Sequence, residues 1–152
     1  MAGWTNKGKY RTLSWALRGA TRPTNFYLAL VTSAVAPNQD INTLSQLTEI
    51  TAGNGYTTGG YSLVPGATDF DVLTEDDTND RGLLQIKDVV WTASGGSIPA
   101  SGGGARYAVL TDDNVTVGSR EVLVYWDLVS DRTVSVGQTL TLQDCEVRIN
   151  EA

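Results

Sequence analysis

Apolar residues recur at helical spacing near the start of the chain. Over residues 6–18, Tyr10, Leu13 and Leu17 fall at positions i, i+3 and i+7. This spacing predicts a helix with one apolar stripe. Gly19 follows directly and is suited to end the helix. The stripe could cover a sandwich core, and removal of the helix would then unfold the rest of the chain.

Short apolar or alternating runs fill most of the remaining sequence, as in β-strands. Residues 26–32 are continuously apolar or β-branched, which predicts a strand buried on both faces. The run 83–92 predicts one long strand that can bend, and residues 139–149 alternate between apolar and polar. Glycine-rich stretches at 53–60 and 95–104 read as surface loops between strands.

Together these elements predict an all-β fold, an antiparallel β-sandwich or jelly-roll-like body with a short N-terminal helix. We expect about eight strands, separated by turn residues as in sandwiches and barrels. A second short helix is expected over 42–50, where apolar residues stand three apart. Because 152 residues can bury one core, we expect a single domain: residues 1–22 as a basic N-terminal arm and residues 23–152 as the body.

Charge is divided unevenly along the chain, whose net charge is −6. Residues 1–39 carry five cations and no acid, whereas the remainder carries 6 basic and 17 acidic residues. A basic segment on an acidic body suggests docking onto an acidic surface, including a neighbouring copy of the same protein. Alternatively, these charges only solvate the helix. The candidate interface residues are the cations and aromatic side chains of this segment: Trp4, Lys7, Lys9, Tyr10, Arg11, Trp15, Arg18 and Arg22.

Histidine is absent from the sequence, which removes the commonest general base and zinc ligand. Two carboxylate pairs could be nominated for glycoside chemistry, Asp69 with Asp71 and Asp112 with Asp113. Acids so close together in turns usually stabilise the turn. We therefore expect no enzymatic activity, no catalytic residue and no cofactor.

The acidic turn at residues 75–80 places Asp76, Thr78 and Asp80 in alternation, as in a calcium loop. It has neither the glycine at the sixth position nor the glutamate at the twelfth. No metal site is predicted, although ion binding at this turn stays open.

Other partners are limited by composition. No apolar stretch is long enough to span a bilayer, and the first 20 residues contain no apolar signal region, so we expect synthesis in a cytoplasm and no membrane partner. A pI near 4.5 argues against a dedicated nucleic-acid binder. The single cysteine, Cys145, lies in an alternating run and is predicted to be a packed thiol.

Several short motifs follow one another in a defined order. Residues 20–32 include Phe26-Tyr27-Leu28-Ala29-Leu30-Val31-Thr32; then come Glu49-Ile50 leading to Gly55-Tyr56, Val89-Val90-Trp91-Thr92-Ala93, and the C-terminal stretches 122–128 and 133–140. This order resembles a group of small tailed-phage virion proteins, in which an N-terminal helix precedes a "lyvALfT" strand, a Gly-Tyr loop and a "v-F/W-pa" strand. The chain departs from that pattern at Gln138, where the group has Asp, and in a longer insertion over 69–81.

The resemblance implies a capsid decoration or cement protein with a β-sandwich or jelly-roll body; such proteins are often labelled tail fibre. On this basis we expect a decoration protein on the outer surface of a phage head, made in the host cytoplasm and located in the virion. Its expected partners are the major capsid protein and itself, as a homotrimer. The alternative is a tail fibre or baseplate protein, whose glycine-rich loops would contact a receptor or glycan. Exposed Tyr56, Tyr61 and Trp91 would favour it, although the position of Trp91 at the end of an apolar run favours the core.

Overall fold

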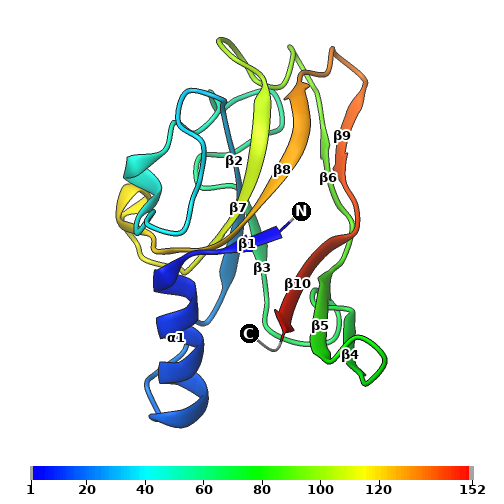
Figure 1. The fold of residues 1–152 in the computed structure, drawn as a ribbon. Coiled ribbons are helices and arrows are strands. Elements are labelled where there is room, and N and C mark those ends of the chain that lie inside the picture. Colours follow the sequence, from blue (N-terminus) through cyan, green and yellow to red (C-terminus); the bar gives the residue numbers. More distant parts are fainter. Residues whose placement is uncertain (1, 151–152) are drawn as a thin grey trace.

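Antiparallel strands make up most of the protein, and one α-helix lies near the N-terminus of the computed structural model, which describes residues 2–150 (Figure 1). The helical elements are α1 (Asn6–Leu17) and the single 3-10 turns η1 (Leu44–Gln46) and η2 (Val117–Ser119). The strands are β1 (Ala2–Trp4), β2 (Phe26–Val31), β3 (Tyr61–Leu63), β4 (Val72–Asp76), β5 (Arg81–Ile86), β6 (Val89–Thr92), β7 (Ala105–Thr111), β8 (Val122–Arg132), β9 (Thr139–Leu142) and β10 (Cys145–Asn150). The prediction of an all-β sandwich with a short N-terminal helix is confirmed.

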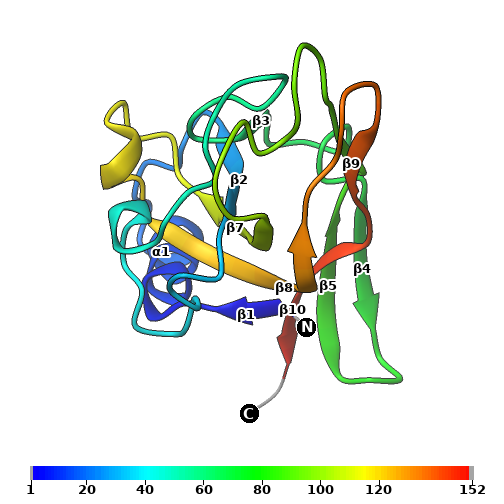
Figure 2. The same cartoon turned by 90° about the horizontal axis from the view of Figure 1, so that it is seen from above.

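One layer of the sandwich is a five-stranded sheet in the order β1-β8-β7-β2-β3. The facing layer contains the pair β6-β9 and the three-stranded sheet β10-β5-β4. Short connections join β5 to β6 and β9 to β10, so the two smaller sheets follow one another along a single layer. Figure 2 shows this layer facing the five-stranded sheet.

Strand β2 is buried on both faces, as its continuous apolar run predicts. Leu28 and Leu30 belong to the core between the two layers. Ala29 and Val31 belong to a second cluster on the opposite face, which the segment around η1 covers. Burial on both faces accounts for the lack of alternation in this run.

Helix α1 begins at a threonine that also binds the sheet. The Thr5 hydroxyl accepts a hydrogen bond from the amide of Gly8 at 2.8 Å and donates one to the carbonyl oxygen of Val122 at 2.6 Å. The helix ends at Leu17 with Arg18 as its C-cap, and the next residue, Gly19, has a φ of +66°, which is unfavourable for residues with a Cβ. Both ends are therefore specified locally, and the first is also attached to β8.

Two predicted elements differ from the structure. The helix expected over 42–50 is reduced to the one turn of η1, because the flanking backbone pairs instead with β2 and β8. The long strand expected over 83–92 is divided at Lys87 and Asp88 into β5 and β6, which pair with β10 and β9 respectively. Strands β1 and β3 contain three residues each, which is too few for an alternating pattern to be recognised in the sequence.

Candidate interaction surface

The N-terminal segment, predicted as an arm distinct from the body, is joined to it in the structure. Strand β1 is one of the two edge strands of the five-stranded sheet and pairs with β8 in the register Ala2 to Trp126. Gly8 is buried against the backbone of Leu123, where a Cβ would overlap the carbonyl oxygen. The described part of this segment is therefore a component of the sandwich.

Two of the predicted interface residues, Trp4 and Trp15, are partly buried and face the interior of the molecule. The Trp4 indole nitrogen donates a hydrogen bond to the carbonyl oxygen of Arg148 at 2.8 Å. The Trp15 ring meets Phe26 edge to face, with centroids 5.9 Å apart, and Phe26 meets Phe70 in the same way. Both tryptophans thus stabilise the fold as well as lining the groove described below.

Lys7 and Arg11 bind the same carboxylate. Arg11 contacts Glu121 through two nitrogens, at 2.5 and 2.8 Å, and the Lys7 ammonium lies 3.6 Å from that side chain. The hydrogen bond from Arg11 lowers the pKa of Glu121 below its ordinary value and raises the pKa of Arg11. These two cations attach α1 to the start of β8 and are therefore already partnered within the molecule.

The remaining cations of the segment, Lys9, Arg18 and Arg22, are exposed. None of them forms an ion pair within residues 2–150. Lys9 lies on the flank of α1, whereas Arg18 caps the C-terminal end of the helix and Arg22 lies in the connection to β2. Their charges are available to a partner.

The apolar stripe predicted for the helix faces solvent. Tyr10, Leu13 and Leu17 are 57%, 59% and 78% exposed, and we call these three residues the helix ridge. At 3.6 residues per turn, they lie on the side of α1 opposite Gly8 and Trp15. The possibility that Leu13 and Leu17 cover the core is therefore wrong, and a large apolar surface remains uncovered.

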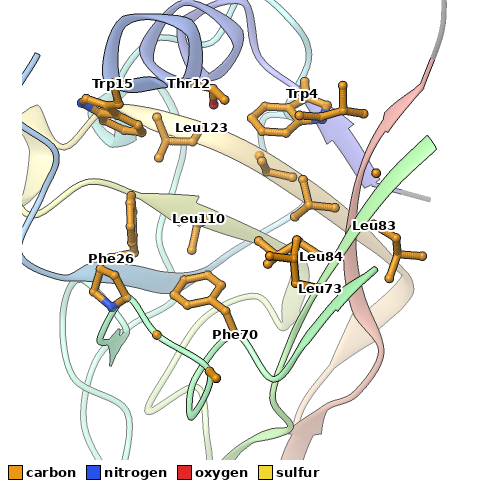
Figure 3. Close-up of a pocket in the computed structure, with 17 residues that line it drawn as sticks. Trp4, Thr12, Trp15, Phe26, Phe70, Leu73, Leu83, Leu84, Leu110 and Leu123 are labelled. Atoms are coloured by element: carbon orange, nitrogen blue, oxygen red, sulfur yellow. The ribbon is translucent and has the colours of Figure 1, made fainter. Parts of the chain in front are cut away.

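An apolar groove of about 560 Å³ opens between α1 and the three-stranded sheet (Figure 3). Trp4, Thr12 and Trp15 line it on the side of β1 and α1, and Thr12 is the one polar residue in its lining. The opposite wall includes the cross-strand neighbours Leu73, Leu84 and Val147 on β4, β5 and β10. Ile149, two positions further along β10, continues this wall.

The outer rim of this groove is open to solvent. Leu73 is 80% exposed and Ile149 is 60% exposed, although both continue the apolar wall. Sequence analysis did not identify this groove. Its lining comes from strands distant in sequence, and β4 carries only a weak apolar alternation, so no local signal marks it.

The hairpin of β4 and β5 gives one side of the groove a negative charge. Residues 71–81 contain five acids and one cation, Arg81. Asp76 binds Arg81 at 2.8 Å, whereas Glu75, Asp77 and Asp80 are exposed. We call residues 71–81 the acidic hairpin.

Asp69 and Asp76, two of the carboxylates considered for catalysis or metal binding, have structural partners, whereas Asp71 and Asp80 are exposed. Asp76 also accepts hydrogen bonds from Asn79, which close the turn. Asp69 binds Lys87 at 2.5 Å and the amide of Val64. Within residues 2–150, no group of three or more potential ligand side chains is arranged to hold a metal ion.

The second carboxylate pair also organises backbone. Asp112 accepts from the amide of Glu121, and Asp113 accepts from the amides of Thr24 and Asn25. Partial burial raises the pKa of Asp112. These contacts give both acids a structural role, since each holds backbone amides that are distant in the sequence.

The aromatic residues considered for receptor binding lie mostly inside. Tyr56 and Trp91 are 2% and 4% exposed, and Tyr61 is partly buried with its ring edge to face against Trp91. Trp91 is therefore a core residue, and this support for a receptor-binding surface is lost.

Cys145 is buried as predicted, and burial raises the pKa of its thiol to about 11.

Nothing in residues 2–150 forms a helix of the length and hydropathy needed to cross a bilayer. No family model, no curated protein and no solved structure matches the chain.

Proposed function

We propose that the protein is a non-enzymatic structural component of a tailed-phage virion, a decoration protein that binds the outer surface of the head as a homotrimer. The order of motifs that resembles small virion proteins supports this reading. Its major partner would be the capsid protein, and its role would be to reinforce the shell by adding contacts between subunits.

The observation that carries the proposal is the distribution of unpaired charge. Arg18 and Arg22 are exposed at the far end of α1 and in the loop after it, whereas most of the chain is acidic. Figure 1 shows this end of α1 projecting beyond the sheets. Two free cations on a projecting end can contact an acidic shell without repulsion from the body.

The proposal is tested by binding of purified protein to undecorated heads. Deletion of residues 1–22 is unsuitable because it would also remove β1 and the buried Thr5. The double variant Arg18→Glu with Arg22→Glu leaves these contacts intact. We expect it to lose at least about tenfold in affinity, since two favourable charge contacts become repulsive.

A matched control is Arg132→Glu, at the end of β8, where the cation is also exposed and forms no ion pair in the described chain. We expect this variant to bind heads like the wild type. Equal binding by the wild type and the double variant would exclude attachment through the basic end.

Copy number separates the decoration role from a tail or baseplate role. Densitometry of purified particles should give hundreds of copies for a decoration protein. A handful of copies confined to the tail would support the alternative instead.

A further inference from the structure

Two apolar surfaces of this molecule are uncovered and cannot cover each other. The helix ridge lies on the outer side of α1, whereas Thr12 and Trp15 on its inner side line the apolar groove. A rigid helix cannot turn both sides toward one cavity. Neither surface is covered by the residues that the structure describes.

The two surfaces have opposite charge at their margins. Helix α1 contains Lys7, Lys9 and Arg11 and no acid. Lys9 borders the ridge, because it lies one helical turn before Leu13. It forms no ion pair within the described residues. The groove is bordered by the acidic hairpin, whose exposed Glu75, Asp77 and Asp80 have no cationic partner in the described residues.

We propose that the helix ridge of one copy packs into the apolar groove of a second copy. Tyr10, Leu13 and Leu17 would contact the wall that includes Leu73 and Ile149. The Lys9 ammonium would then approach the acidic hairpin of the neighbour. The inference rests on the self-association included in the proposed function, and it is independent of attachment to a shell.

Size and shape agree with this pairing. The ridge extends over about 10 Å of helix, because Leu17 lies seven positions after Tyr10 and each step rises about 1.5 Å. The groove volume of about 560 Å³ lies in the range of clefts that accept several side chains. An amphipathic helix laid into an apolar groove is a common recognition mode.

A ridge-to-groove contact is heterologous, because the two copies contribute different surfaces. Every copy in such an assembly has one ridge and one groove to offer. The contacts close into a ring if the rotation between copies permits, and otherwise continue as a chain. The proposal therefore predicts assemblies larger than a dimer without a second type of interface.

The first experiment is sedimentation of the purified full chain over a range of concentrations. We expect the wild type to associate. A ridge variant, Leu13→Asp with Leu17→Asp, and a groove variant, Leu73→Asp with Ile149→Asp, should each raise the dissociation constant at least about tenfold, since each replaces buried apolar contact by charge. All four positions are exposed in one copy, so folding should be retained.

Val115→Asp is the matched control, because Val115 is 97% exposed and lies outside both surfaces. It should associate like the wild type, with the same circular dichroism and melting temperature as the other variants. A wild type that stays monomeric at millimolar concentration would overturn the inference, as would wild-type association of the ridge variant.

Mixing the two defective variants gives the decisive result. The groove variant keeps an intact ridge and the ridge variant keeps an intact groove, so the mixture should form a complex that stops at two copies. A pairing of groove with groove would instead leave the ridge variant fully associated and give no complex on mixing.

The same proteins separate this inference from the proposed function. The Arg18→Glu, Arg22→Glu variant should still associate in solution even where it no longer binds heads. Wild-type association of the ridge variant in solution, together with normal binding of that variant to heads, would overturn self-association through the ridge and leave the decoration role standing.

Discussion

The indole nitrogen of Trp4 and the carbonyl oxygen of Arg148 are 2.8 Å apart, which joins the first strand of the chain to the last. Trp126 makes the corresponding contact with the carbonyl oxygen of Glu146 at 2.9 Å. Strand β10 pairs only with β5 in the described chain. Trp4 and Trp126 bind carbonyl groups of β10 that no neighbouring strand occupies. A strand edge occupied in this way is less available for pairing with another molecule.

Replacement of Trp4 by phenylalanine should lower the free energy of unfolding by about 1 kcal/mol more than the same change at Trp15. Both rings line the apolar groove, but only the Trp4 indole donates a hydrogen bond in the described structure. A protein hydrogen bond contributes roughly this amount. Urea denaturation measures the difference. Equal effects of the two substitutions would show that the contact with Arg148 adds no stability.

Alanine at Gly8 should destabilise the protein although alanine is the better helix former. The added Cβ would overlap the carbonyl oxygen of Leu123, and α1 would have to move away from β8. We expect a loss of about 1–3 kcal/mol, as for overpacking in a core. Gly82→Ala is the control, because nothing lies within 4 Å of a Cβ added there. An unchanged melting temperature for the Gly8 variant would contradict the close approach of helix and sheet.

Stability should depend on pH through Glu121. Its pKa in the folded protein lies below the ordinary value of 4.5, because Arg11 and Lys7 favour the charged carboxylate. The stabilisation is therefore fully present above pH 4.5 and is lost as the pH falls through the lowered pKa. Glu121→Gln should cost up to about 1 kcal/mol near neutral pH, the upper range for a partly exposed ion pair.

Thermal denaturation of the wild type and the Glu121→Gln variant across this pH range tests the dependence. The difference between them should shrink as the pH decreases below 4.5. Glu75→Gln, at an exposed position with no ion pair in the described chain, should differ little from the wild type at any pH. A constant difference between wild type and Glu121→Gln would exclude the ion pair as its source.

Removal of the Tyr56 hydroxyl should cost about 1–3 kcal/mol, the range for leaving a buried polar group unsatisfied. This hydroxyl accepts from the amide of Leu30 at 2.9 Å and donates to Glu49 at 2.7 Å. Burial first, and then the contact with Glu49, raises the pKa of Tyr56 well above its ordinary value, whereas the hydrogen bond from the Leu30 amide acts in the opposite direction. In Tyr56→Phe the Leu30 amide, inside the core, has no acceptor. The exposed Tyr10 supplies the control, since Tyr10→Phe should change the urea midpoint little.

Sequence alone predicted the elements whose environment is uniform. The run around Leu28 and Leu30 is buried on both faces, Trp91 is buried at the end of its apolar run, and Cys145 is buried within its alternating run. Burial at such positions depends on how apolar the surrounding run is, and this can be read directly from the sequence.

Orientation was less predictable. The stripe of Tyr10, Leu13 and Leu17 located the helix, but its buried side is set by Gly8, which has no side chain to signal burial. The groove between Trp15 and Leu73 depends on the pairing of β4 with β5 and on the position of α1. Neither relationship has a local pattern in the sequence.

The attachment of α1 to β8 also sets the stage of synthesis at which the N-terminal segment can reach its folded position. The hydroxyl of Thr5 binds the carbonyl oxygen of Val122, 117 residues later in the chain. On the ribosome, the N-terminal segment is made first but finds its place only after most of the polypeptide has emerged. An incomplete chain therefore cannot hold the ridge and the basic end in their final positions, and under the proposed ridge-to-groove contact this order would keep nascent copies from associating prematurely.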